Sequence, residues 1–419
     1  MANTSNGSKL ALLGGKRMTS LLSSPAWPPV WPATARKLAK AYLSANWSFN
    51  GPVEQEFSQA FATFHSARHG IFMANGTVTL QCALAACGVG EGDEVIVPAL
   101  TWLATAMAAR YLGAKPVFVD IEPATLCMDP RLVEAAITRR TKAIIPVHLY
   151  GGSPDMDAIM ALAARHKLRV IEDCAHGHGG RWAGKGYGSC GHIGSFSFQQ
   201  SKAIASGEGG ICITDDDELA ERLFRLKHIG YGPGELKGVA RGGLPADLVC
   251  HNYRGTEFQA VILLDQLKKF SDRIAIYNAN AARIEKRLAG CKNVRVQSRG
   301  RRTDRQSYYA LALIFENALA GVPVKRIAEA ALAEGFPALY GTYGPVYRHA
   351  LWNLPAKAFR IHGGSCPVSE GLATASTGVI MHPWLGCDEA VIDSIAEILA
   401  KIDANAKALA KAKAVAGKQ

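Results

Sequence analysis

Short apolar runs alternate with longer segments of helical periodicity from about residue 70 to residue 172. The apolar runs are rich in Val and Ile, which predicts buried strands, and the segments between them repeat apolar residues at the spacing of a helix. Because the strands are apolar throughout and helices separate them, the pattern indicates a mainly parallel sheet with helices on both faces. The predicted strands are 70–74, 94–98, 116–120, 143–148 and 169–172, and the helices between them are 76–87, 101–112, 130–138 and 156–166.

The alternation ends after residue 172, where strands are predicted at 193–198 and 210–214 without a full helix between them. One of these two strands is predicted to run antiparallel, because parallel neighbours need a long crossover connection. Further helices are predicted at 34–44, 54–65, 215–227, 258–288, 324–334 and 390–404, and a further strand at 308–314. The expected fold class is α/β, with a smaller C-terminal α+β domain.

The pattern divides the chain into four predicted regions. Residues 1–32 are expected to form a flexible N-terminal segment, because the proline- and tryptophan-rich stretch 25–32 suits neither a helix nor a central strand. A large α/β domain is predicted at 33–265 and a small α+β domain at 266–405. Residues 406–419 are predicted to form a basic tail.

Composition describes a globular chain of 419 residues, with 48% hydrophobic and 20% charged residues. No apolar run approaches the roughly 20 residues that cross a bilayer, and the N-terminus lacks a secretory core, so a cytoplasmic location and no membrane partner are expected. The net charge of +12 lies largely in residues 299–305 and in the C-terminal tail. A solvated loop and a fraying helix explain both, and without a recognisable module no nucleic-acid partner is expected.

Ten cysteines are scattered along the chain without a C-x-x-C pair. Most of them lie inside apolar runs, so they are interpreted as reduced core residues, and no metal is expected.

Candidate chemistry appears where predicted strands end, and the carboxyl ends of parallel strands meet at one edge of a sheet. After the first strand, Asn75, Gly76 and Thr77 open directly into a helix. Helix N-terminal N–H groups, a glycine and a hydroxyl can bind phosphate, although a plain helix cap explains them equally well. Trp102 follows the second strand, where an aromatic ring either packs in the core or stacks on a planar ligand.

Two charged residues follow later strands. Asp173 comes just after the strand 169–172, where a carboxylate either caps a turn or holds a cation. Lys202 follows the strand 193–198, with Ser197 five positions before it and a glycine-rich turn after it. A loop lysine is commonly a solvated surface charge, but burial would lower its pKa and leave the neutral amine that a Schiff base requires.

A phosphate cradle, an aromatic plate, a carboxylate and a lysine at neighbouring strand ends are what pyridoxal 5′-phosphate (PLP) requires. The lysine forms a Schiff base with it, and the carboxylate keeps its pyridine nitrogen protonated. No G-x-G-x-x-G follows the first strand and no G-K-[ST] occurs in the chain, which disfavours dinucleotide and ATP binding.

From about Trp47 to its end, the sequence resembles the DegT/StrS family of sugar and cyclitol aminotransferases. The resemblance rests on dense local motifs, among them N-G-P-V-E-Q-E-F, E-G-D-E-V-I-V-P-A-L-T-W-L-A-T, G-A-K-P-V-F-V-D-I, I-E-D-C-A-H, S-F-S-F-Q-Q-S-K and G-E-G-G. It implies a fold type I PLP-dependent transferase.

Carried over position by position, the resemblance implies a role for each candidate residue. Lys202 would hold PLP covalently as a Schiff base, and Asp173 would pair with the pyridine nitrogen. Trp102 would stack on the ring, and the phosphate would be held by Gly76, Thr77 and Ser197. His176 stands where family members often have a glutamine bonded to the phenolic oxygen. Asn252 would reach the phosphate of a neighbouring subunit, which implies a homodimer with shared active sites.

Within the family, the segments around Lys202, 257–267 and 305–311 look closest to glutamine-dependent aminotransferases of scyllo-inosose-type cyclitols. The expected reaction moves an amino group from glutamine or glutamate to a keto-cyclitol or keto-sugar. Alternatives are a nucleotide-keto-sugar aminotransferase, an aminohydroxybenzoate synthase-like enzyme and a PLP-binding regulatory protein. A dehydratase is disfavoured, because such relatives usually replace the Schiff-base lysine with histidine. Other plausible pocket residues, each more simply explained by packing, are His148, Tyr150, His178, Tyr343 and His382, with loops 230–243 and 340–347.

Overall fold

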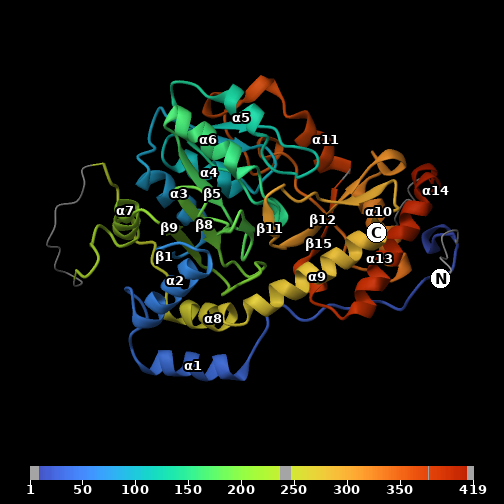
Figure 1. Ribbon diagram of the computed structural model, residues 1–419, viewed down its shortest axis with the longest axis horizontal. Helices are drawn as coiled ribbons and strands as arrows, with labels where there is room; N and C mark the ends of the chain where they lie inside the picture. Colours follow the sequence, from blue (N-terminus) through green and yellow to red (C-terminus); the bar gives the residue numbers. More distant parts are fainter. Residues whose placement is uncertain (1–8, 236–246, 376, 413–419) are drawn as a thin grey trace.

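The computed structural model describes residues 9–235, 247–375 and 377–412, and its centre is an eight-stranded sheet in the order β1-β9-β8-β5-β4-β2-β3-β14 (Figure 1). Only β9 runs against the other strands, since it pairs antiparallel with both β1 and β8 while the remaining pairs are parallel. The prediction of one antiparallel strand in a mainly parallel sheet is confirmed. The strands are β1 His69–Met73, β2 Glu94–Pro98, β3 Lys115–Val119, β4 Thr141–Ile144, β5 Arg169–Asp173, β8 Ile193–Ser197, β9 Gly210–Thr214 and β14 Arg360–Ile361.

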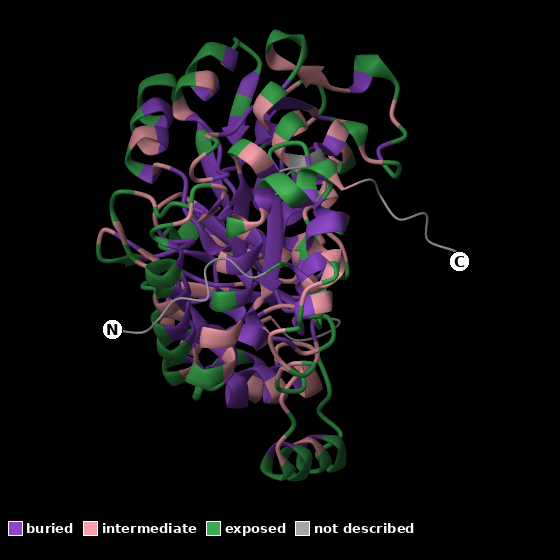
Figure 2. Ribbon diagram, turned by 90° about the vertical axis from the view of Figure 1, so that its right-hand side faces the viewer, coloured by how far each residue is buried: buried purple, intermediate pink, exposed green. Residues whose placement is uncertain are grey.

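Helices cover both faces of this sheet, because its strands are apolar on both sides (Figure 2). Along β9, Ile211 and Ile213 pack into one buried cluster and Cys212 packs into the other. The first cluster lies under α2 Pro52–Phe64, α5 Pro130–Ala136, α6 Met156–His166 and α8 Glu257–Leu267; the second lies under α3 Gly76–Ala86, α4 Leu103–Tyr111 and α7 Asp217–Lys227. At the lower edge of Figures 1 and 2, α1 Pro32–Leu43 packs on α8.

A second, antiparallel sheet in the order β10-β12-β15-β13 forms the core of the C-terminal part. Its strands are β10 Val294–Val296, β12 Ala310–Phe315, β13 Tyr340–Gly341 and β15 Thr377–Met381, and its helices are α9 Phe270–Leu288, α10 Val324–Glu334, α13 Glu389–Ala404 and α14 Ala406–Lys411. The single helix predicted at 258–288 is two helices, since α8 ends at Leu267 and α9 begins at Phe270. The two helices connect the sheets along the chain: α8 packs on α1 and α2 of the large domain, and α9 packs on α13 of the C-terminal part (Figure 1).

Several smaller elements connect these parts. Between β13 and β15 the chain returns to the large sheet, where β14 pairs with β3 and the N–H groups of Val368 and Ser369 donate to Asp120 (both 2.8 Å). The remaining elements are β6 Arg181–Trp182, β7 Lys185–Gly186, β11 Thr303–Arg305, α11 Pro367–Ala375, α12 His382–Leu385 and the short helices η1 Ala11–Leu13, η2 Leu149–Gly151, η3 Asn317–Leu319, η4 Val346–Arg348, η5 Ala356–Ala358 and η6 His362–Gly364.

The described part of the N-terminal segment, which is predicted to be flexible, makes several contacts with the C-terminal part. Leu10 is fully buried, and the N–H groups of Ala11 and Met18 donate to the carboxylate of Glu334 (2.8 and 3.1 Å), which also pairs with Lys401. A buried carboxylate needs such donors, so it holds the segment in place. The start of the predicted basic tail is likewise packed, since Ala406 and Leu409 are buried; residues 413–419 lie outside the described residues.

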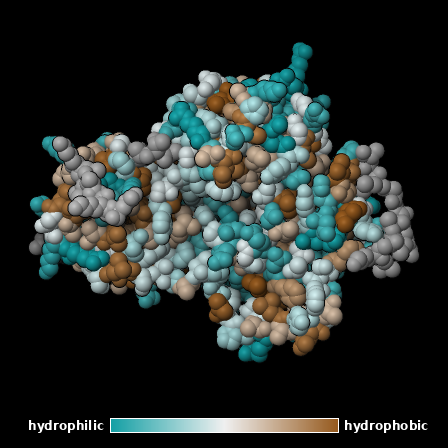
Figure 3. Space-filling model, turned by 180° about the vertical axis from the view of Figure 1, so that it is seen from behind, coloured by the Kyte–Doolittle hydropathy of each residue, from teal (hydrophilic) through white to brown (hydrophobic). Residues whose placement is uncertain are grey.

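The surface of the molecule mixes hydrophobic and hydrophilic residues over the face seen from behind (Figure 3). Among the described residues, no helix has the length and apolar character needed to cross a membrane. All ten cysteines are free thiols, and seven of them are buried.

Candidate active site

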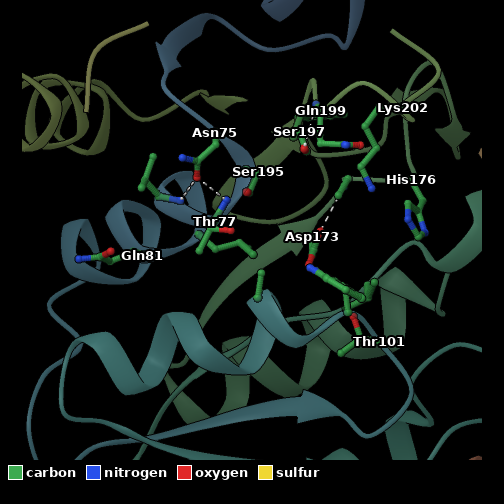
Figure 4. A pocket seen from close by; sticks show the side chains of 18 of the residues that line it. Asn75, Thr77, Gln81, Thr101, Asp173, His176, Ser195, Ser197, Gln199 and Lys202 are labelled. Carbon is green, nitrogen blue, oxygen red and sulfur yellow. Dashed lines mark hydrogen bonds between the residues drawn. The ribbon is translucent and has the colours of Figure 1, made fainter. Parts of the chain in front are cut away.

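A cavity of about 930 Å³ lies at the carboxyl ends of the strands of the large sheet (Figure 4). Its walls come from the loop after β1, the loops after β2 and β5, the segment after β8, and two tyrosines of the C-terminal part. Seven of the eight predicted cofactor residues line it, namely Gly76, Thr77, Trp102, Asp173, His176, Ser197 and Lys202. Gly76 and Lys202, 126 positions apart in the chain, thus meet at one edge of the sheet, as expected for parallel strands.

The side of the cavity opposite Lys202 is formed by the start of α3. Asn75 caps this helix, because its Oδ1 accepts hydrogen bonds from the N–H groups of Thr77 and Val78 (3.1 and 3.0 Å). Next to it, a Cβ on Gly76 would lie 2.6 Å from the Cβ of Ser197, so only glycine allows α3 and β8 to approach this closely. The helix cap and the candidate phosphate cradle are therefore both present. Asn75 accepts hydrogen bonds from the first N–H groups of the helix, while Thr77 and Ser197 line the cavity.

Asp173 is buried at the end of β5, and its carboxylate is held by two donors. The hydroxyl of Thr105 donates to Oδ2 (2.7 Å), and the N–H of Ala175 donates to Oδ1 (3.1 Å). Burial raises the pKa of Asp173 above its usual value, while these hydrogen bonds and the charge of Lys202 oppose the rise. The site thus fixes the orientation of a carboxylate that has little access to water.

Lys202 lies half-buried in the segment after β8, and its side chain points toward Asp173 and His176 (Figure 4). Burial lowers the pKa of its amine to about 8, against the opposing effect of the Asp173 charge. Its Nζ also lies 4.6 Å from the centre of the Tyr309 ring. A lysine with this pKa is neutral in a large fraction of molecules at mildly alkaline pH, as a nucleophilic amine must be.

His176 is buried and stacks on the Tyr309 ring, with the ring centres 3.8 Å apart and the planes 4° from parallel. Its Nδ1 accepts a hydrogen bond from the N–H of Tyr150 (3.3 Å). Burial holds the pKa of His176 well below its usual value, helped by the charge of Lys202. The ring is therefore neutral with its hydrogen on Nε2, which makes His176 a hydrogen-bond donor.

Trp102 and Asn252 differ in their surroundings. Trp102 precedes α4 at the cavity wall, is 51% exposed, and meets the Tyr343 ring edge-on at 5.9 Å. Asn252 is exposed and lies outside the lining of the cavity. Its assignment to a neighbouring subunit's site stays a prediction.

The model of the DegT/DnrJ/EryC1/StrS aminotransferase family matches residues 32–399 of this chain. The chain belongs to this family.

Its relatives include an L-glutamine:2-deoxy-scyllo-inosose aminotransferase of Micromonospora echinospora, 38% identical over 418 residues, which span 96% of this chain and 99% of that protein. An L-glutamine:scyllo-inosose aminotransferase of Streptomyces griseus is 37% identical over 84% of this chain and 85% of its own length. Among solved structures, 3-amino-5-hydroxybenzoic acid synthase is 31% identical with a TM-score of 0.81, over 91% of this chain and 98% of its own. The family and its structural neighbours are PLP-dependent enzymes, and this chain is an aminotransferase.

Sequence reasoning did not assign three residues that shape the site of this aminotransferase. Tyr309 stacks on His176 beside Lys202, Thr105 binds Asp173, and Gln199 accepts from the N–H and hydroxyl of Ser201 (2.8 and 2.7 Å). All three lie within motifs that resemble the family: Tyr309 in R-Q-S-Y-Y-A-L, Gln199 in S-F-S-F-Q-Q-S-K, and Thr105 at the end of E-G-D-E-V-I-V-P-A-L-T-W-L-A-T.

Of the five further pocket candidates, only Tyr343 lines the cavity. His148 and His178 are buried beneath it against aromatic rings, while Tyr150 and His382 pack behind His176 and Tyr309. Of the predicted acceptor loops, 340–347 supplies Tyr343, the described part of 230–243 supplies no lining residue, and residues 236–243 lie outside the described residues.

One buried group in this aminotransferase has ligand-type atoms close together, since those of His148, Glu172 and Cys174 all lie within 4.8 Å. The Glu172 oxygens already accept hydrogen bonds from the His148 ring and from the N–H groups of residues 188, 190 and 191 (2.6–2.9 Å). Burial also holds the pKa of Cys174 well above its usual value, whereas a metal-bound thiol must be deprotonated. We interpret this group as a hydrogen-bond network and propose no metal there.

Proposed function

We propose that this aminotransferase moves an amino group from L-glutamine or L-glutamate to the keto group of a cyclitol, using PLP held by Lys202. One observation carries the proposal: the half-buried Lys202 amine, with a pKa lowered to about 8, and the buried Asp173 carboxylate line one cavity at the ends of parallel strands. The named relatives support the cyclitol, because the activities for which they are named use scyllo-inosose-type acceptors.

The residues of the cavity fit PLP. The close approach of Gly76 to Ser197 leaves a helix N-terminus and two hydroxyls, those of Thr77 and Ser197, for a phosphate. Trp102 would lie against the ring, and Asp173 would take the pyridine nitrogen. His176, a donor through Nε2, suits the phenolic oxygen. When bound, the group supplies an electron sink for the carbon that loses its proton.

The protein's own residues then divide the work of proton transfer and charge stabilisation. Lys202, displaced from the cofactor by the amino donor, would take the proton from the donor's α-carbon as a general base and pass a proton on within the same half-reaction. In the second half-reaction it would supply a proton to the acceptor carbon. Asp173 keeps a positive charge on the ring nitrogen, because its carboxylate is fixed by Thr105 and Ala175 and shielded from water. The Tyr309 ring, whose centre lies 4.6 Å from the Lys202 Nζ, limits the access of water to this amine.

An acceptor screen tests the proposal. The purified protein is first converted to its amino form with L-glutamine, with L-glutamate in parallel, and the change of cofactor absorbance is followed. Keto-cyclitols and nucleotide-linked keto-sugars are then offered, and amine product is measured by mass spectrometry. We expect turnover with a keto-cyclitol. Turnover confined to nucleotide-linked keto-sugars would show that these, and not keto-cyclitols, are the acceptors. The absence of a response to either amino donor would favour a cofactor-binding regulatory protein.

We further propose a homodimer in which Asn252 completes the partner's phosphate site, which is consistent with its exposure outside its own cavity. Mixing two inactive variants, Lys202→Ala and Asn252→Ala, tests this. If the sites are shared, subunit exchange creates dimers with one intact site, and up to about half of the sites in mixed dimers regain activity. No recovery, although mass spectrometry shows mixed dimers, would contradict the shared site.

A further inference from the structure

The segment 199–206 carries Lys202 and has neither helix nor strand, so its backbone polar groups need partners from elsewhere. We call it the lysine loop. Four of its carbonyl oxygens accept hydrogen bonds from side chains outside the loop. The pairs are Trp27 Nε1 with Gln200 O (2.9 Å), His382 Nε2 with Ser201 O (3.0 Å), an Arg273 nitrogen with Ala203 O (3.2 Å) and Gln266 Nε2 with Ala205 O (2.5 Å).

Three of these four donors also contact one another. The Trp27 and His382 rings meet edge-to-face at 4.4 Å and 83°, and the Arg273 guanidinium lies 5.2 Å from the centre of the Trp27 ring. We call Trp27, His382 and Arg273 the support cluster. It comes from the N-terminal segment, α12 and α9, and it binds the carbonyl groups of Gln200 and Ser201, the two residues immediately before Lys202.

His382 links the lysine loop to the aromatic ring beside the Lys202 amine. Burial lowers the pKa of His382 to about 4, so the ring is neutral. Its Nδ1 accepts from the Tyr277 hydroxyl (3.4 Å), which leaves the hydrogen on Nε2 for Ser201 O. The backbone N–H of His382 donates to Tyr309 O (3.1 Å), and the Tyr309 ring lies 4.6 Å from Lys202 Nζ.

The N-terminal segment is fastened on both sides of Trp27. Before it, Ala11 and Met18 are bound to Glu334. After it, the Trp31 ring lies under the Lys269 amine (3.8 Å), and Thr34 donates to Asp265 (2.7 Å). Trp27 is therefore held against the lysine loop by contacts that do not involve the loop.

We propose that Trp27 and His382 are positioning residues for Lys202: they fix the backbone of the lysine loop, and so hold the amine in its partly dehydrated place opposite Asp173. The inference rests on the proposed function, because it assigns what supports the lysine of that site. It gives the N-terminal segment a role in the active site, although none of its described residues, 9–32, lines the cavity.

Loosening the lysine loop would admit water to the amine and move its pKa upward, toward the ordinary value for lysine. A rise in the pKa of Lys202 can be attributed to water only if the titratable groups that face its amine are unchanged. They are Asp173, His176, His178, Tyr309 and His382. Substitution of Trp27 replaces none of these groups, whereas substitution of His382 removes one of them. Trp27 is therefore the better position at which to measure the effect on the pKa of Lys202.

The experiment compares Trp27→Phe and Trp27→Ala with Trp31→Phe, a matched control in the same segment. The Trp31 ring lies 3.8 Å from the Lys269 amine, and its indole N–H is not one of the donors to the lysine loop. In the full-length protein freed of cofactor, the reactivity of Lys202 toward an amine-acylating reagent is measured by peptide mass spectrometry from pH 6 to 10. For Trp27→Ala we expect about tenfold slower labelling of Lys202 at pH 7, which is a rise of about one pKa unit. Trp27→Phe keeps the ring contacts but loses the hydrogen bond, so we expect a smaller change in the same direction. Trp31→Phe should match the wild type.

A second arm uses the holoenzyme. His382→Gln can still donate to Ser201 O, whereas His382→Phe cannot, so we expect kcat to fall severalfold in the Phe variant and to recover in the Gln variant, with the KM for the amino donor little changed. Wild-type labelling in both folded Trp27 variants would overturn the proposal, as would equal losses in the two His382 variants. Because labelling needs no acceptor, the outcome is independent of whether the proposed reaction is correct.

Discussion

The two sides of the cavity are built differently. The cradle side rests on a local cap and on one close contact within the large domain. Asn75 caps its own helix, and Gly76, just after β1, meets Ser197 of β8, which β9 separates from β1 in the sheet. The lysine side depends on side chains far away in the sequence, from Trp27 to His382. The cap of the cradle thus follows from local structure and its close contact from the strand order of one sheet, whereas the position of Lys202 depends on the N-terminal segment and the C-terminal part meeting around one loop.

Removal of the Lys202 amine, on the lysine side of the cavity, is expected to have the largest effect on activity. In Lys202→Ala we expect turnover to fall below detection and the visible absorbance of covalently held cofactor to disappear, because the amine is both the attachment point and the base. Assays of half-reactions and absorbance spectra check this. Lys268→Ala is the control, since that side chain is 57% exposed and paired only with Glu56 on the surface. A yellow, active Lys202→Ala protein would refute the assignment of the site.

Asp173→Asn should have the next largest effect. The amide has the same shape and can keep the hydrogen bond from Thr105, so the fold should persist, but the negative charge is lost. We expect kcat to fall by about 10² to 10³, comparable to the loss of one preorganised electrostatic contact. Steady-state kinetics measure kcat, and a thermal melt checks that the fold persists. Asp157→Asn, at an exposed ion pair with Arg302, is the control. Near-normal kcat would remove the proposed role of Asp173.

On the cradle side, Gly76→Ala should weaken cofactor binding. The new methyl group would lie 2.6 Å from the Cβ of Ser197, and such overpacking costs about 1–3 kcal/mol. We expect a higher cofactor dissociation constant in fluorescence titrations and a lower melting temperature. Gly90→Ala is the matched control, because a Cβ there meets nothing within 4 Å. Equal behaviour of the two variants would show that α3 and β8 can move apart freely.

The smallest expected effect is a shift in pH dependence. The Thr105 hydroxyl donates to Asp173 and lowers its pKa, so its removal in Thr105→Val should raise that pKa further. The acid-side fall of kcat/KM should then begin at a higher pH, by about one unit. Thr105→Ser keeps the hydroxyl and should behave as the wild type. A Thr105→Val profile that overlays the wild type would mean that Asp173 does not control the acid limb.

Most regular elements of the large sheet could be predicted from the sequence. The predicted bounds of β2, β9, α6 and α10 coincide with those in the structure, because their apolar periodicity and flanking glycines or prolines are local signals. The break between α8 and α9 at Lys268 and Lys269 could not be predicted, since neither residue interrupts a helix by itself. The same holds for the return of β14 to the large sheet.

The sequence by itself determined the α/β class, the position of the candidate residues at strand ends, and the resemblance to the family. These features depend on periodicity, on the rule that parallel strands share a carboxyl edge, and on local motifs. Only the tertiary structure decided that Lys202 is partly dehydrated, that His176 is a neutral donor, and that the N-terminal segment is packed against the lysine loop. Burial and hydrogen bonding between distant residues arise when separate elements pack, and no local pattern of residues encodes them.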